Sequence, residues 1–232
     1  MNIELANVIK LYATKSHKEL NAYLIEKSKD VIIALLTDLV TTYINDKNSS
    51  TLREFITVVL AGYEHSEGKI GYNGYKQNSI LAGKPIQCEA KPKNFDTSQL
   101  EKVKSGERKT KPAKLAGNGN FSDYTFKRLA RDLKENLNIL VSGFVDGKLI
   151  YILEFPFSHD AFVAKLKKQL KNKFPNGDKS GMFLRSANFY YGDYTNCKEL
   201  RILFLLDKKE LQEYKTYINN GFYVFLMGEN GK

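Results

Sequence analysis

Two apolar runs on either side of an Asp-Gly pair constrain the fold of this chain more than any other feature of its sequence. Residues 138–145 (NILVSGFV) and 149–155 (LIYILEF) are rich in β-branched and aromatic side chains, and only Asp146, Gly147 and Lys148 separate them. Such runs are typical of strands, and an Asp-Gly pair between two strands is typical of a tight hairpin turn. The sequence therefore predicts a β-hairpin at this point of the chain.

Apolar residues at helical spacing predict a helical N-terminal region over residues 1–48, a candidate for dimerisation. Asp30 is well placed to cap the last of its three expected helices, which cover 3–13, 17–27 and 29–45. The same spacing recurs over 51–61, where Ser50 or Thr51 can cap the helix, a glutamate follows three residues later and Gly62 ends it.

The rest of the chain mixes strand and helix signals. We expect turns and an edge strand over 63–84, strands over 84–91, 199–207 and 222–228, and helices over 122–137 (capped by Ser122 or Asp123), 159–174 and 208–219. Two segments are expected to be loops: 96–121, which lacks apolar periodicity and should be mobile, and the aromatic stretch 184–197. The mixed order predicts one α/β (α+β) domain over 1–232, with a mixed central β-sheet flanked by helices.

Positive charge favours a polyanionic partner. The chain has 36 Lys and Arg against 26 Asp and Glu, a net charge of +10, and nucleic acid is the partner class that such a balance favours. The excess of positive charge is concentrated over 84–119, a segment that contains nine basic and four acidic residues. A solvated lysine-rich loop would have the same composition, so both interpretations stay open.

Other features limit the compartment and the chemistry. No apolar run approaches the length of a membrane helix, the first residues lack a signal-peptide pattern, and the cysteines Cys88 and Cys197 lack paired spacing. We therefore expect a cytoplasmic protein with no membrane association. The three histidines are too scattered for a zinc cluster.

A carboxylate and an ammonium lie two residues apart in the expected strand 84–91. Glu89 and Lys91 should project from the same side of that strand. A carboxylate can hold Mg²⁺ beside a phosphodiester, the carbonyl of Ala90 can add a ligand, and a lysine can orient the attacking water. Such a site needs a second metal ligand, for which the candidates are Asn73, Glu64 and Glu67. An ordinary salt bridge on a solvated strand is the alternative.

The segments LREFITVVLAG (52–62), GKIGYNGY (68–75) and CEAKPKN (88–94), followed by a helix and two strands, resemble the core of the PD-(D/E)xK nucleases, and type II restriction endonucleases in particular. The resemblance covers about residues 51–156. It implies a restriction-endonuclease-like core, a Mg²⁺ cofactor, catalytic roles for Glu89 and Lys91, and a homodimer that cuts a palindromic site in double-stranded DNA. Asn73 stands where the family has an acidic residue, and an amide is a weaker, neutral ligand.

Further residues are candidates for contacts with DNA. Phosphate contacts are expected from basic side chains: Lys93, Lys109, Lys111 and Lys114. Base contacts are expected from Arg185 and from the amides, namely Asn118, Asn120, Asn188 and Asn196, and thymine methyl or sugar contacts from Tyr190 and Tyr191. Amides outnumber arginines among them, which favours an A·T-rich site. A non-catalytic DNA-binding accessory protein and a non-specific repair nuclease are the alternative functions.

Overall fold

The computed structural model of the chain describes residues 3–45, 50–66, 72–77 and 83–229. Within these ranges the core is a mixed six-stranded sheet, and the chain therefore has the mixed α/β fold expected from the sequence. The strand order is β1 (Glu64–His65), β2 (Gly74–Lys76), β3 (Ile86–Phe95), β5 (Asn138–Val145), β6 (Lys148–Pro156) and β8 (Arg201–Leu205). β3 and β5 are parallel, and the other neighbouring pairs are antiparallel.

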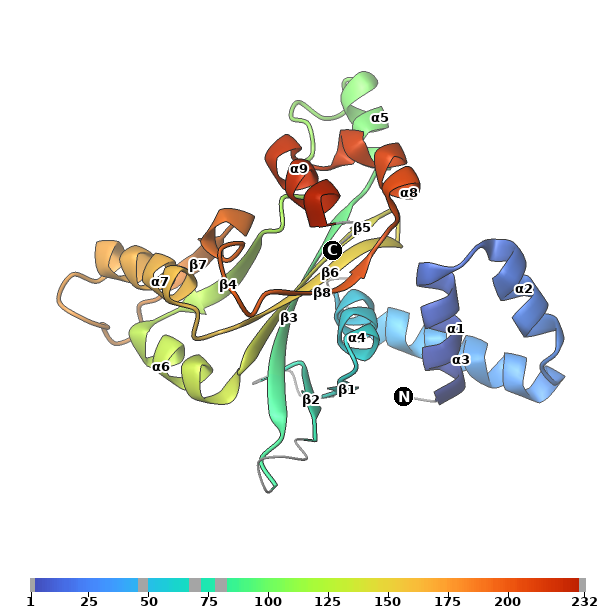
Figure 1. Cartoon of the computed structure of the whole chain (residues 1–232), viewed down its shortest axis with the longest axis horizontal. Helices are drawn as coiled ribbons and strands as arrows, with labels where there is room; N and C mark the ends of the chain where they lie inside the picture. The colour runs from blue at the N-terminus through green and yellow to red at the C-terminus, as the bar shows by residue number, and fades with distance from the viewer. Residues whose placement is uncertain (1–2, 46–49, 67–71, 78–82, 230–232) are drawn as a thin grey trace.

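The predicted hairpin forms the centre of this sheet (Figure 1). Asp146 and Gly147 both have positive φ, 49° and 84°, as a two-residue type I′ turn requires. β5 and β6 are buried along nearly their whole length, because other elements cover both faces of the sheet. Continuous apolar strands of this kind are stable only between two covering layers.

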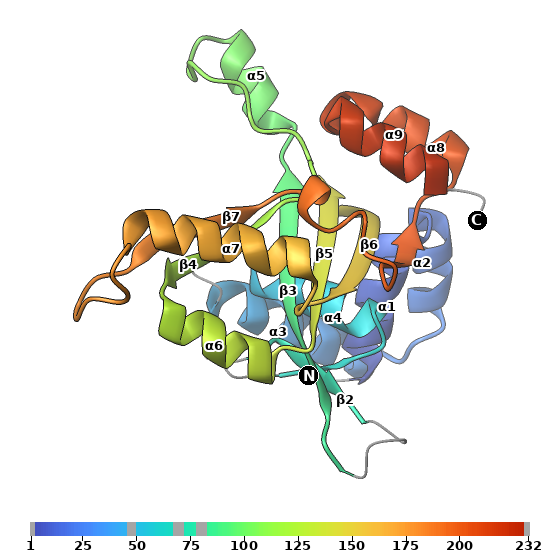
Figure 2. The ribbon, with the colours of Figure 1, turned by 60° about the vertical axis from the view of Figure 1, so that its left-hand side comes forward.

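Helices cover one face of the sheet, and the other face carries helices together with a small ribbon (Figures 1 and 2). The first face packs on α1 (Ile3–Thr14) and α4 (Thr51–Leu60), beside α2 (His17–Ile25) and α3 (Lys29–Asn45). The second face packs on α6 (Phe126–Glu135), α7 (Asp160–Lys173), α8 (Lys208–Glu213), α9 (Asn220–Glu229) and the antiparallel pair of β4 (Gly119–Tyr124) and β7 (Leu184–Phe189). In the described part of the chain, no helix is both long and apolar enough to cross a bilayer.

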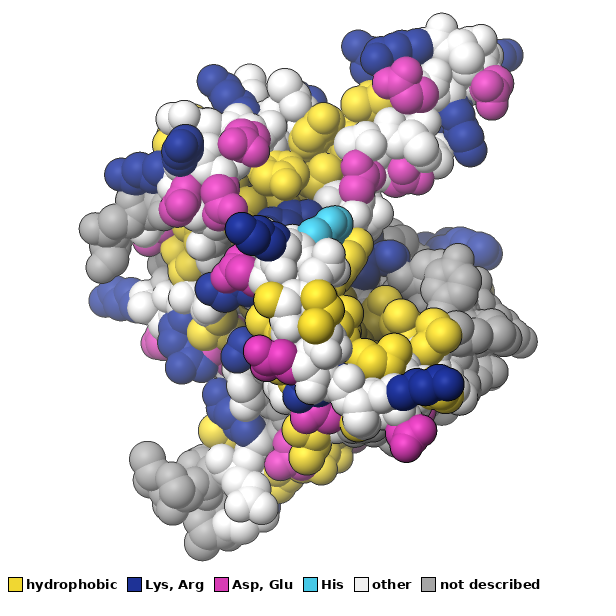
Figure 3. Space-filling model, turned by 90° about the vertical axis from the view of Figure 1, so that its right-hand side faces the viewer, with side chains coloured by type: hydrophobic (Ala, Val, Ile, Leu, Met, Phe, Trp, Pro, Cys, Tyr) yellow, Lys and Arg dark blue, Asp and Glu magenta, His cyan; other side chains and the backbone are white. Residues whose placement is uncertain are grey.

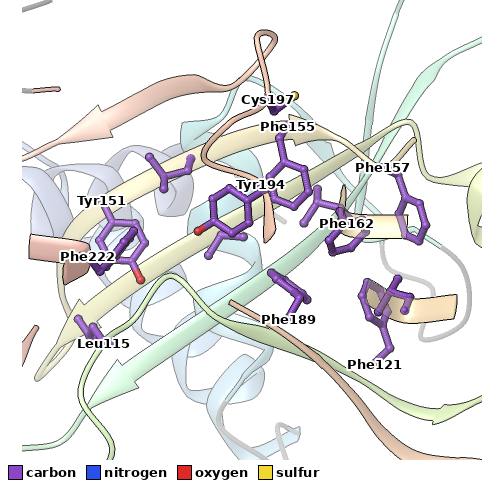
Figure 4. Close-up of a cluster of buried hydrophobic side chains, with 14 of the residues drawn as sticks. Leu115, Phe121, Tyr151, Phe155, Phe157, Phe162, Phe189, Tyr194, Cys197 and Phe222 are labelled. Carbon is purple, nitrogen blue, oxygen red and sulfur yellow. The ribbon is translucent and has the colours of Figure 1, made fainter. Parts of the chain in front are cut away.

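Aromatic side chains fill the space between the second face and its cover (Figure 4). The rings of Phe155 and Tyr194 stack with centroids 4.4 Å apart, and Tyr151 meets Phe222 edge to face at 5.0 Å. The Tyr194 hydroxyl donates to the carbonyl of Gly117 at 2.7 Å. The segments that carry β4, β7 and α9 are thus held on the hairpin from distant parts of the sequence.

Three assignments made from the sequence are wrong in this region. The expected loop 96–121 contains α5 (Ser98–Lys104) and the start of β4, and the expected aromatic loop 184–197 begins with β7. The expected strand 222–228 is part of helix α9, because its buried side chains recur at helical spacing and Phe222 reaches the hairpin. Local sequence patterns do not identify β4 and β7 as strands, because each is short and pairs only with the other.

Helix caps and strand ends differ from expectation in detail. The Ser28 hydroxyl, and not Asp30, accepts from a first-turn amide of α3. Thr125 caps α6 by accepting from the Arg128 amide at 3.1 Å. The expected helix 122–137 therefore starts late, after β4. The expected helix 208–219 is α8 followed by a 3₁₀ turn over Lys215–Tyr217.

One carboxylate is buried on the first face of the sheet. Glu154 of β6 is 1% exposed, and its oxygens accept from the Tyr63 hydroxyl and from Arg201. Lys76 Nζ lies 4.0 Å away, and Asn138 donates to the Tyr63 hydroxyl at 2.8 Å. Burial, followed by the interaction with Glu154, raises the pKa of the Tyr63 hydroxyl far above its usual value. The cluster thereby links β2, β5, β6 and β8.

Removal of this carboxylate should destabilise the fold. We expect Glu154→Ala to lower the free energy of unfolding by about 1–3 kcal/mol, because the buried Tyr63 hydroxyl loses its acceptor. Urea unfolding at neutral pH measures the change. Glu135→Ala, which removes an exposed partner of Arg131, is the matched control and should cost at most about 1 kcal/mol. Equal effects of the two substitutions would contradict a structural role for the cluster.

Candidate metal and phosphate site at the edge of β3

β3 presents two chemically different faces. Cys88 and Ala90 point towards Val58 of α4 and are buried. Glu89 and Lys91 point to the opposite face, where Lys91 Nζ forms a salt bridge with Glu89 Oε1 and lies 4.6 Å from the centre of the Phe121 ring. The prediction that Glu89 and Lys91 share one side of a strand is thus confirmed. Both are largely removed from water, unlike a pair on a solvated strand.

Asn73 lies just before β2 and binds the edge of β3 that pairs with β2. Its backbone amide donates to the carbonyl of Cys88 at 2.9 Å, and its Oδ1 accepts from the amide of Ala90 at 2.7 Å. The N–H and C=O of one strand residue point to the same edge, so the Ala90 carbonyl also faces this side. The structure therefore brings Asn73 to Ala90, the residue between Glu89 and Lys91.

Glu54 of α4 is a member of this group that the sequence analysis missed. Asn73 Nδ2 donates to Glu54 Oε2 at 3.4 Å, so the amide bridges α4 and β3. Glu54 approaches the edge of β3 from the α4 side, whereas Glu89 lies on the other face. The sequence signal was ambiguous, because a glutamate three residues into a helix is also a capping residue. In the structure the Ser50 side chain makes no capping hydrogen bond.

The other two candidates for the second metal ligand lie elsewhere. Glu64 is exposed on β1, two strands away from β3, opposite Tyr75. Its hydrogen bond raises the pKa of the Tyr75 hydroxyl. Glu67 lies outside the described residues.

The oxygen atoms near this edge are of the kind that magnesium binds. They are the carboxylates of Glu89 and Glu54, the Ala90 carbonyl and the second lone pair of Asn73 Oδ1. Among the described residues no three His, Cys, Asp or Glu side chains form a metal-binding group. Mg²⁺ is usually held by one or two carboxylates, with waters and substrate phosphate oxygens as the other ligands, so a sparse set of this kind is compatible with it.

Lys93 extends the row of Glu89 and Lys91 along β3. Its Nζ donates to Asn120 Oδ1 of β4 at 3.1 Å. Burial, with a smaller contribution from Lys91, lowers the pKa of Lys93. Asn120 in turn pairs with Asn188 of β7 across the ribbon. The structure thus brings three of the expected DNA-contacting residues next to the Glu89–Lys91 pair.

The remaining expected DNA-contacting residues are dispersed. Lys109, Lys111 and Lys114 are exposed on the segment that follows α5, and Arg185 is exposed near the start of β7. Asn118 directly precedes β4, Asn196 Oδ1 lies 3.0 Å from His159 Nε2, and Lys165 Nζ lies 5.8 Å from the ring of the exposed Tyr190. The Tyr191 ring packs on Phe222, with centroids 5.4 Å apart.

The sequence matches no protein-family model and no curated protein. Function must therefore be inferred from the geometry of the site.

Neutralisation of Lys93 should have opposite effects on stability and on DNA binding. The lowered pKa means that the folded state disfavours the ammonium form, a cost present at neutral pH and lost above the ordinary lysine pKa of about 10.4. We expect Lys93→Met to raise the urea midpoint at pH 7, by an amount that shrinks as pH rises towards that value. Binding to duplex DNA should lose about 0.9 in its salt-dependence slope. Lys84→Met, at an exposed position, is the control; a lower urea midpoint for Lys93→Met would refute the argument.

Proposed function

We propose that this chain is a Mg²⁺-dependent nuclease that cuts both strands of a specific, A·T-rich and palindromic DNA site, as type II restriction endonucleases do. The observation that carries the proposal is the Glu89–Lys91 pair on one face of β3, with Asn73 bound to the backbone of Ala90 between them and Glu54 bound to Asn73. A carboxylate-lysine pair of this kind suits phosphodiester hydrolysis.

The order of the elements supports the proposal. Helix α4 precedes the antiparallel strands β1, β2 and β3, and α6 then leads to β5, which lies parallel to β3. A helix, a turn segment, a strand with Glu-x-Lys, a helix and two strands is the arrangement on which the resemblance to PD-(D/E)xK nucleases rests. The net charge of +10 adds support for a polyanionic substrate.

The residues at the edge of β3 have different chemical roles in this proposal. The oxygens of Glu89, Glu54, Asn73 and the Ala90 carbonyl would hold Mg²⁺, which supplies a Lewis acid beside the phosphate and lowers the pKa of a bound water. Lys91 then orients the attacking water and stabilises the charge that develops on the phosphate. The Phe121 ring supports its ammonium by a cation–π contact. Lys93 is placed to contact a neighbouring phosphate.

Cleavage of both strands calls for two copies of the site, and we include a homodimer in the proposal. Figure 3 views the side of the N-terminal helices, where apolar side chains reach the surface. Among the large apolar side chains of these helices, Ile25 of α2 and Ile33 and Leu36 of α3 are 82%, 52% and 60% exposed. Exposed apolar side chains on these helices are available for contacts with a second copy, and we assign them to dimerisation.

A second candidate function is DNA binding without cleavage. The observation that favours it is the Glu89–Lys91 salt bridge, in which each charge already satisfies the other. A non-specific repair nuclease remains a third candidate. Incubation of plasmid DNA with Mg²⁺, and with EDTA in parallel, separates the three: discrete fragments support the proposal, a smear supports the repair nuclease, and retardation alone supports the binding protein.

Loss of the Lys91 ammonium should abolish cutting and spare binding. We expect Lys91→Gln to lower the cleavage rate by about 10²- to 10³-fold, since the developing charge loses a donor. Retention of duplex DNA in Ca²⁺, measured by gel retardation, should be little changed, because most affinity comes from other phosphate contacts. Lys84→Gln is the surface control. Cleavage by Lys91→Gln within tenfold of wild type would exclude Lys91 from catalysis.

The ligand set can be resolved by isosteric substitutions. We expect Glu89→Gln and Glu54→Gln to raise the Mg²⁺ concentration needed for half-maximal cleavage, because each loses a charged oxygen donor. Asn73→Ala should do the same, with the added loss of the hydrogen bond to the Ala90 amide. Glu64→Gln, two strands away, is the control, and Glu67→Gln completes the series. A larger effect at Glu64 than at Glu54 would contradict this ligand set.

A further inference from the structure

The ribbon of β4 and β7 has one buried face and one polar face. Gly119, Phe121, Ala187 and Phe189 are buried against the core. The side chains on the other face are small and polar, and they pair across the two strands in register: Asn120 with Asn188, and Ser122 with Ser186. Each of these four side chains is at least partly accessible to solvent. A polar ladder of this kind contributes little to the core, so its composition calls for another explanation.

The ribbon is held rigidly. Gln169 of α7 binds both backbone groups of Asn188, accepting from its amide at 2.9 Å and donating to its carbonyl at 2.8 Å. These bonds cover the outer edge of β7 at that residue. On β4, Arg128 donates to the carbonyl of Ser122. The polar face is thus presented with little freedom to rearrange, as recognition of a fixed pattern requires.

The amides on this face are oriented by their own protein partners. Asn120 Oδ1 accepts from Lys93, and Asn188 Oδ1 accepts from the Ser186 hydroxyl at 3.0 Å. Both Nδ2 groups make no hydrogen bond within the described part of the chain. The face therefore offers oriented N–H donors, and each oxygen keeps a second lone pair.

The ribbon also adjoins the candidate catalytic row. Asn120 touches Lys93, and the inner side of the same strand places Phe121 under the ammonium of Lys91. A phosphate held by Lys91 and Lys93 would therefore lie beside the polar face. Arg185 near the start of β7, and Lys165 next to Tyr190 just past its end, add positive charge at the two ends of β7.

We propose that the polar face of the β4–β7 ribbon enters the major groove and reads purine bases through Asn188 and Asn120. The inference rests on the proposed nuclease function and assigns its specificity surface. The major groove is about 12 Å wide and admits a two-stranded ribbon. An asparagine Nδ2 donates to adenine N7 while its oxygen accepts from N6. Recognition thus comes from paired strands, and Asn196, bound to His159, takes no part in it.

The experiment compares wild type, Asn188→Ala and the control Asn172→Ala, which alters an exposed amide of α7. Genomic DNA is digested in Mg²⁺, and the fragment ends are sequenced to give the consensus site. We expect Asn188→Ala to lose about 5- to 150-fold in kcat/KM on that site and to relax one position of the consensus. Asn172→Ala should match wild type. Thermal unfolding of all three proteins checks that the variants are folded.

A second arm uses altered DNA, so that its first measurement, made on wild type, does not depend on a variant's folding. The consensus site is copied with 7-deazaadenine in place of adenine, which removes the N7 acceptor from the major groove. Wild type should cut this copy about 5- to 150-fold more slowly than normal DNA. The ratio of the cleavage rate on normal DNA to the rate on the 7-deazaadenine copy should be smaller for Asn188→Ala, because this variant has already lost one contact with N7.

The outcomes separate the two proposals. If wild type cuts no DNA, the nuclease function fails and the ribbon proposal fails with it. If wild type cuts specific sites, but Asn188→Ala keeps the same consensus, rate and response to 7-deazaadenine, only the ribbon proposal is overturned. A response of wild type to 7-deazaadenine that is equally large in Asn188→Ala also overturns it, because another element then reads N7.

Discussion

Burial of the β5–β6 hairpin on both faces is the constraint on which the rest of the structure depends. One face receives Tyr194 and Phe222 against Phe155 and Tyr151, and the other packs on α1 and α4. Aromatic rings of this size contribute strongly to folding, through their area and through edge and offset contacts. The hairpin thereby fixes where α9, the ribbon and α4 lie, and the ribbon and α4 border the candidate site.

The candidate site lies where this buried sheet comes to an edge. β3 pairs with β5 from Cys88 to Phe95, whereas its ladder with β2 covers Ile86, Gln87 and Cys88. At Ala90 the Asn73 side chain binds this second edge. Pro92 follows, a residue that sheets tolerate at an edge. Glu89, Lys91 and Lys93 are thus held near the core, while in the described part of the chain no strand pairs with this edge of β3 beyond Cys88. Groups that are costly to bury often mark functional sites, because their cost is retained only where they serve a purpose.

The same geometry links chemistry to recognition. Lys93 touches both the row on β3 and, through Asn120, the polar ladder of the ribbon. A substrate bound by Lys91 and Lys93 would lie beside the ribbon. A shift of the ribbon would move Phe121 away from Lys91. The proposed cutting and reading functions therefore share one rigid unit, in which sequence recognition would position the phosphate for attack.

The sequence by itself determined the elements whose signals are local. The Asp-Gly turn and its two apolar runs specify the hairpin, apolar spacing specifies α1 to α4 and α7, and the two-residue period of a strand puts Glu89 and Lys91 on one side. Tertiary structure decided the rest. Glu54 reaches Asn73 from another element, β4 and β7 pair from distant segments, and the short apolar run 222–228 becomes helical against the hairpin. The reason is physical: periodicity records how a segment meets its own neighbours, whereas partners from elsewhere in the chain are chosen by packing, which a short run does not encode.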